Sequence, residues 1–173
     1  MRYLSLILIC NCFQINFAQE INNNPLHTED PIQQQQWVDS LYNSMSIDER
    51  IGQLFMVQVL SENSAKTNNK VLALIKNQHI GGVIYSKGGP VRQARLNNDF
   101  QAAAKVPLLV GMDAEWGLSM RLDSTYAFPW NMTLGAISDN KLVEQTGRQI
   151  GEHCQRLGVH FNFAPVVDIN TNP

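Results

Sequence analysis

Short apolar runs alternate with helix-type segments along most of this chain. The runs at 54–60, 83–85, 106–112 and 159–167 are rich in valine, leucine and isoleucine, as buried strands are. Between them lie segments with helical patterns, and Pro90 occupies the position that proline favours at a helix start. Strands that alternate with helices form βαβ units and a parallel sheet. We therefore expect an α/β fold.

The number of these repeats indicates a barrel that is incomplete. A (β/α)8 barrel takes about 250 residues, whereas this chain has 173 residues and four strand-type runs. No helix-type segment follows the last run before Pro173. We expect residues 37–173 to form the N-terminal part of a (β/α)8 TIM-like barrel, truncated after about half of its length.

The first 36 residues have a different character from the rest of the chain. Arg2 is followed by an apolar run and then by Phe17-Ala18, a pattern that predicts a signal peptide over residues 1–18. A short buried strand or a membrane anchor is the alternative, but the run is shorter than the about 20 residues of a membrane-spanning helix. Residues 19–36 are rich in Asn and Gln and predict a flexible leader. We expect an exported protein, periplasmic or extracellular, with no transmembrane segment beyond the signal.

Two helix starts carry specific signals. Ser46 is followed three residues later by Glu49, the spacing of a capping box, and the helix should run towards Gln53. Ser138 is the expected cap of a helix that ends at Gly158. A long loop is expected before Ser138.

Composition argues against several classes of partner. The formal net charge is −2 and the basic residues are scattered, so we expect no nucleic-acid partner. The four histidines lack metal-ligand spacing, and the paired glycines lack the dinucleotide-binding pattern, so we expect no metal and no cofactor. Cys154 would be the one cysteine left after removal of the signal, which allows no internal disulfide.

The residues from 113 to 121 offer the clearest chemistry. Asp113 ends a buried strand, where parallel barrels assemble their sites, and Arg121 lies on the same loop. A carboxylate accepts hydrogen bonds from sugar hydroxyls, and a guanidinium donates them. Alternatively, Asp113 caps the following turn and Arg121 pairs with Glu115 or Asp123. Trp116 could stack on a sugar ring or pack under the loop.

The same loop resembles a motif of glycoside hydrolase family 3. Residues 113–121 look like the family's Asp-Gln-Glu-Gly-Gly loop with its trailing arginine, and residues 163–173 look like its later strand and Asp-x-Asn loop. Residues 51–55 and 81–84 fall where the family has its opening helix and second strand, so the resemblance covers about residues 37–173. The loop departs from the family at two positions, with alanine at 114 and tryptophan at 116.

The resemblance implies roles for individual residues. Asp113 would bind hydroxyls of the sugar in the −1 subsite, and Arg121 would contact the same sugar. Asp168 has no such role in the family, and would either brace its loop or touch the ligand. The family retains anomeric configuration, with an aspartate nucleophile and a separate acid/base, and both are expected beyond Pro173. No residue of this chain is therefore predicted to be catalytic, and the chain alone is expected to be inactive.

Within the family, the chain looks most like exported bacterial β-N-acetylhexosaminidases. Such enzymes remove β-linked N-acetylglucosamine from peptidoglycan or chitin fragments. A β-glucosidase is the alternative within the family. An alternative of another class is a non-catalytic exported sugar-binding module, which the open sheet edges of half a barrel disfavour.

Overall fold

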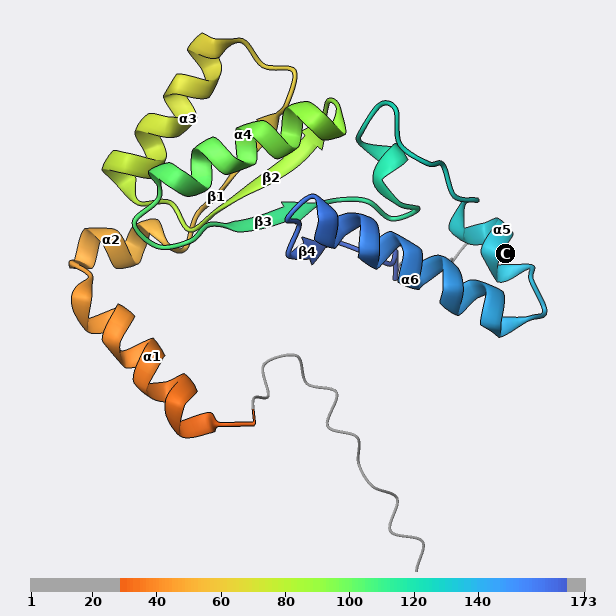
Figure 1. Cartoon of the computed structure of the whole chain (residues 1–173), viewed down its shortest axis with the longest axis horizontal. Helices are drawn as coiled ribbons and strands as arrows, with labels where there is room; N and C mark the ends of the chain where they lie inside the picture. Colours follow the sequence, from red (N-terminus) through yellow and green to blue (C-terminus); the bar gives the residue numbers. More distant parts are fainter. Residues whose placement is uncertain (1–28, 168–173) are drawn as a thin grey trace, which may run out of the picture. The chain divides into compact units, whose positions relative to one another are not determined.

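Within residues 29–167, which the computed structural model describes, four strands form one parallel sheet (Figure 1). The strands lie side by side in the order β1-β2-β3-β4, the order in which they occur along the chain. This consecutive order is the one that a (β/α)8 barrel requires, and it confirms the predicted α/β fold. The strands are β1 (Met56–Leu60), β2 (Gly82–Lys87), β3 (Leu109–Met112) and β4 (Phe161–Asn162).

Most of the hydrophobic core lies between the sheet and two helices, α3 (Ala65–Gln78) and α4 (Pro90–Ala103), which cover one face of the sheet (Figure 1). Successive side chains of a strand point to opposite faces, and Val59, Tyr85 and Met112 lie in register on the covered face with no solvent exposure. This placement explains why the strand runs are apolar, since their buried residues pack against helices.

The opposite face of the sheet is the lumen face, which would line the interior of a barrel. Met56 on β1 and Phe163 beyond β4 both approach Gly111 here. A Cβ atom on Gly111 would lie 2.8 Å from a ring carbon of Phe163 and 3.2 Å from the sulfur of Met56. Glycine at 111 therefore leaves room over β3 for both of these larger side chains.

Two of the predicted helix starts are confirmed. In α2 (Ile47–Gly52), the Ser46 hydroxyl accepts a hydrogen bond from the Glu49 amide, and the Glu49 carboxylate accepts one from the Ser46 amide. Both bonds satisfy amides that a helix start otherwise leaves unpaired. Pro90 is the first residue of α4, as predicted.

The first described helix begins earlier than predicted. The chain divides into two units after Ser40, and α1 (Pro31–Ser44) starts six residues before Trp37, inside the segment predicted as a leader. The carboxylate of Asp30 accepts a hydrogen bond from the amide of Gln33, and Pro31 is at the first helical position. Glutamine is a good helix former, so a run without an apolar period is still helical here.

Three further differences concern the second half of the chain. The cap of α6 (Asn140–Arg156) is Asp139 and not Ser138, because the Asp139 carboxylate accepts the hydrogen bond from the helix amide. The expected long loop contains a 3-10 turn, η1 (Leu118–Met120), and a short helix, α5 (Asn131–Gly135). Of the run at 159–167, two residues form strand β4.

Some of the sequence predictions fall elsewhere in the chain. The predicted signal peptide and Asp168 lie outside the described residues. Between residues 29 and 167, none of the helices combines the length and apolar character needed to cross a membrane.

Candidate functional site

Asp113 directly follows β3, at the carboxyl edge of the sheet, as the sequence predicts. Its side chain is 35% exposed, so the carboxylate is open to a ligand. One carboxylate oxygen, Oδ2, accepts a hydrogen bond from Arg121. Within residues 29–167 the other oxygen, Oδ1, accepts none, and an ionised carboxylate has capacity for several.

Arg121 is held against Asp113 by two bonds. Its Nε donates to the backbone carbonyl of Asp113 at 2.7 Å, and a terminal nitrogen donates to the carboxylate. The alternative that Arg121 pairs with Glu115 or Asp123 is therefore wrong, and Asp123 instead pairs with Arg92 at 2.6 Å. Fixing the planar guanidinium at two atoms sets the direction of its remaining N–H groups.

The turn after Asp113 depends on Gly117. Its φ of 93° lies where residues with a side chain are strained, and a Cβ atom would meet a ring carbon of Phe128 at 2.8 Å. Trp116, which stands where the family has another glycine, does not have a positive φ. The tryptophan is thus compatible with the backbone of the loop, and glycine is required one residue later.

The side-chain amide of Asn162 ties the loop to β4. Its nitrogen donates to the carbonyl of Ala114 at 3.1 Å, and its oxygen accepts from the amide of Ala114 at 3.0 Å. The side chain of Ala114 is fully buried, which fits a small residue at this position. This two-bond contact, the Asn162 clamp, fixes the backbone immediately after Asp113.

The loops after β1, β2 and β3 are also bound to one another. The buried Ser61 hydroxyl accepts from the amide of Gly89 at 3.0 Å, and the Ser61 amide donates to the carbonyl of Lys87 at 2.8 Å. The Gly88 amide donates to the carbonyl of Arg121 at 3.2 Å. Asp113 and Arg121 therefore lie on a braced edge of the sheet.

Two polar residues on the lumen face were missed by sequence reasoning. Gln58 on β1 donates from Nε2 to the hydroxyl oxygen of Ser86 on β2 at 2.8 Å. Because Tyr85 pairs with Met112, Ser86 and Asp113 each lie one residue beyond a paired position on neighbouring strands. The signals were a polar residue inside the run at 54–60 and another directly after the run at 83–85, but only the strand register places the two near Asp113.

A cleft opens between the loops that follow β3 and β4. Its volume is about 400 Å³, and it is adjoined by a larger hollow of about 650 Å³ that also includes Glu115 and lies along α6. The rings of Trp116 and Trp130 lie 6.1 Å apart with planes inclined at 48°. The smaller cleft, called the aromatic cleft below, is lined by Glu115, Trp116, Trp130, Asn131, Pro165 and Val166.

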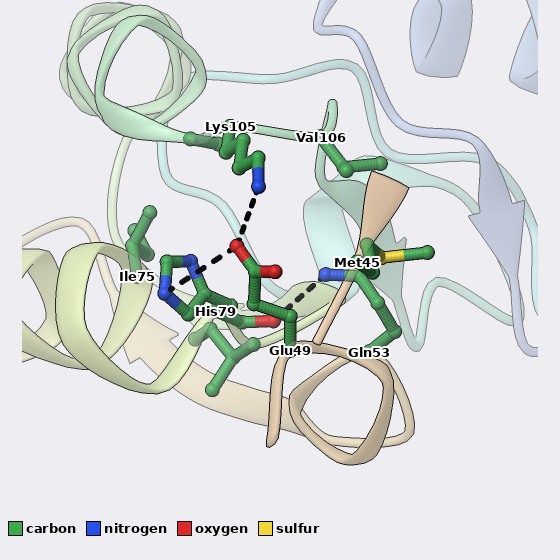
Figure 2. A pocket seen from close by; sticks show the side chains of 9 residues that line it. Met45, Glu49, Gln53, Ile75, His79, Lys105 and Val106 are labelled. Carbon is green, nitrogen blue, oxygen red and sulfur yellow. Dashed lines mark hydrogen bonds and ion pairs between the residues drawn. The ribbon is translucent and has the colours of Figure 1, made fainter. Parts of the chain in front are cut away.

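A charged cluster lies at the opposite, amino edge of the strands (Figure 2). The Glu49 carboxylate accepts from Lys105 Nζ at 2.6 Å and lies 3.9 Å from His79 Nε2, while Gln53 donates to the carbonyl of His79 at 2.7 Å. The cavity between them is about 10 Å³, room for about one water molecule. The hydrogen bonds from Lys105 and the Ser46 amide lower the pKa of Glu49 to about 2. This cluster joins α2 to the segments that precede β2 and β3.

Between residues 29 and 167 there is neither a metal-binding cluster nor an exposed cysteine. No group of three or more His, Cys, Asp or Glu side chains between residues 29 and 167 is arranged to hold a metal ion. Cys154 is buried on α6, and burial raises the pKa of its thiol. At the carboxyl edge, Asp113 offers a hydrogen-bond acceptor and Arg121 offers donors, which are the two kinds of group that hydrogen-bond to a polyhydroxylated ligand.

Comparison with known proteins establishes the family. The model of the glycosyl hydrolase family 3 N-terminal domain matches residues 46–173, and the chain belongs to this family. It is 29% identical over 136 residues to a beta-N-acetylglucosaminidase/beta-glucosidase of Cellulomonas fimi, covering 79% of this chain and 23% of that protein. It is 33% identical over 113 residues to beta-hexosaminidase A of Pseudoalteromonas piscicida, covering 58% of this chain and 19% of that protein.

The fold is also similar to that of a solved structure. The chain is similar to a beta-glucoside phosphorylase, BglX, with a TM-score of 0.69 and 25% identity, over 82% of this chain and 24% of that one. The chain thus spans about a quarter or less of the length of each of these three proteins.

Proposed function

We propose that the whole protein carrying this chain is a retaining β-glycosidase that removes β-linked N-acetylglucosamine. The observation that supports this most directly is the Asp113–Arg121 ion pair at the carboxyl edge of the sheet, in which no other residue of the described range 29–167 bonds to the second carboxylate oxygen. Two relatives bear names that state an activity on hexosamine glycosides. The substrates proposed are peptidoglycan or chitin fragments.

In the proposed reaction this chain binds one sugar ring in the −1 subsite. The Asp113 carboxylate accepts hydrogen bonds from ring hydroxyls, and Arg121 donates to an oxygen of the same ring. Hydrogen bonds to the sugar lower the activation barrier only if they are stronger in the transition state, when positive charge develops on the ring, than in the bound substrate. The nucleophile and the acid/base, which retention places about 5 Å apart, are expected in a part of the protein outside this chain. The 173-residue chain alone is expected to be inactive.

A β-glucosidase is the second candidate, favoured by the double name of the Cellulomonas fimi relative. The experiment that separates the two compares p-nitrophenol release from the N-acetyl-β-glucosaminide and from the β-glucoside by the full-length protein. Faster release from the glucosaminide supports the proposal, and faster release from the glucoside supports the second candidate. Sugar binding without release from either substrate would instead support a non-catalytic sugar-binding module.

The location of this activity is proposed from the sequence alone. The predicted signal peptide over residues 1–18 supports export to the periplasm or the cell exterior. N-terminal sequencing of the mature protein tests this, because export with cleavage predicts a new terminus at Gln19. A mature protein that retains Met1 would contradict cleavage.

A further inference from the structure

The aromatic cleft is not used by the proposed binding of one sugar ring. Trp130 is 70% exposed, although an indole is among the largest apolar side chains. Trp130 directly precedes α5, and its ring packs against that of Trp116. Two tryptophans that meet at a cleft of about 400 Å³ leave apolar surface that a ligand could cover.

The chemistry of the cleft suits a carbohydrate. Sugars present apolar C–H faces that pack on the face of an aromatic ring, and the 48° inclination keeps the two indoles from covering each other face to face. Glu115 and Asn131 on the wall of the cleft supply a carboxylate and an amide for hydroxyl groups. Apolar walls with a few polar groups are the usual composition of small-ligand sites.

The position of the cleft relates it to Asp113. Trp116 lies three residues after Asp113 on the same braced loop, and Pro165 and Val166 follow β4, the strand next to β3. The cleft therefore belongs to the same carboxyl edge as the Asp113–Arg121 pair. We propose that the aromatic cleft binds the neighbouring ring of a β-linked oligosaccharide whose other ring is held by Asp113 and Arg121. This inference rests on the proposed function.

The test uses the full-length protein and two substrates that share the first sugar. One is the β-1,4-linked disaccharide of N-acetylglucosamine or of glucose, whichever sugar the protein prefers. The other is the β-fluoride of the same sugar, which has no second ring. Trp116→Ala and Trp130→Ala are expected to lower kcat/KM for the disaccharide by about tenfold, the effect of losing one buried apolar contact, with little change for the fluoride. Phe at either position should restore part of the loss. Trp37→Ala, on the exposed helix α1, is the matched control and should change neither rate.

The outcomes separate this inference from the proposed function. If the wild-type protein cleaves the fluoride and neither substitution changes the rate on the disaccharide, the proposed role of the aromatic cleft is wrong. The proposed function is unaffected by that result. Equal losses on both substrates with a lowered Tm assign the two tryptophans to packing against another part of the protein, which also overturns the role of the cleft. If the wild type cleaves neither substrate, the proposed function fails. Binding at the aromatic cleft is then tested by titrating the Trp37→Phe variant with the disaccharide and following its tryptophan fluorescence. Unchanged fluorescence would show that the cleft does not bind the disaccharide.

Discussion

The two edges of the sheet both carry an ion pair, but they differ in how fully the carboxylate is used. At the amino edge, Glu49 is 14% exposed and receives hydrogen bonds from Lys105 and from a backbone amide. At the carboxyl edge, Asp113 is 35% exposed and, within residues 29–167, keeps one oxygen without a partner. A carboxylate whose bonds are all made within the protein holds elements together, whereas one with an open oxygen can still bind a ligand.

The largest effect is expected at the open carboxylate. Asp113→Ala should lower kcat/KM of the full-length protein on its preferred p-nitrophenyl glycoside by about a hundredfold, equivalent to about 3 kcal/mol of lost transition-state contact. Asp123→Ala is the matched control, since Asp123 lies on the same edge in an exposed pair with Arg92, and it should change the rate little. An unchanged rate in Asp113→Ala would remove the proposed role.

The loop that presents Asp113 is expected to be sensitive at its glycine. Gly117→Ala forces a side chain into a backbone conformation that suits glycine and into contact with Phe128, so it should destabilise the fold by about 1–3 kcal/mol. Urea unfolding measures the difference. Gly147→Ala, in the middle of α6 with open space around it, is the control and should stabilise the protein by about 0.5–1 kcal/mol. A stable Gly117→Ala variant would mean that the loop has another conformation.

A smaller effect is expected at the polar pair beside Asp113. Ser86→Ala removes a hydroxyl held by Gln58, and it should lower kcat/KM by about fivefold, as one neutral hydrogen bond of about 1 kcal/mol would. Steady-state kinetics of the full-length protein measures this. Ser138→Ala serves as the control, because Ser138 does not cap α6. Identical kinetics in the two variants would show that the lumen-face hydroxyl is not used.

The smallest effect is expected at the amino edge, and it should depend on pH and not on substrate. The pKa of Glu49 is lowered from 4.5 to about 2 in the folded chain, so its stabilising contribution is present above about pH 4.5 and is lost as the pH falls towards 2. Glu49→Gln should therefore be less stable than wild type at pH 7, and the difference in urea midpoint should shrink below pH 4.5.

Glu62→Gln is the control for the amino edge. Glu62 pairs with Lys87 at 3.0 Å, but the two side chains are 42% and 67% exposed, so the pair should contribute little. Equal midpoint shifts in the two variants would show that the amino edge has no special role in stability. A lower kcat in Glu49→Gln at unchanged stability would contradict the division between the two edges.

The sequence predicted the parts of the fold that depend on local pattern. The apolar runs could be recognised as strands because residues that are buried against helices must be apolar. Ser46 and Pro90 could be placed at helix starts because helix capping depends on residues close in sequence. The start of α1 was missed because glutamines carry helix propensity without an apolar period.

The candidate site was predictable only in part. Asp113 could be placed because a residue that follows a parallel strand lies at a known edge of the sheet. Its pairing with Arg121, and not with Glu115 or Asp123, depends on the path of the intervening loop, which local pattern does not determine. The Gln58–Ser86 contact joins residues 28 positions apart and requires the register of two strands.

The Asn162 clamp has a consequence for how this loop could be altered. The side-chain amide of Asn162 bonds only to backbone atoms of Ala114. Strand β4 is two residues long, and these two bonds continue the link between β3 and β4 beyond it. Exchanges at 115 or 116 leave both of those bonds available. The residues next to Asp113 could therefore be varied to retune selectivity, while Asp113 keeps its place on the edge.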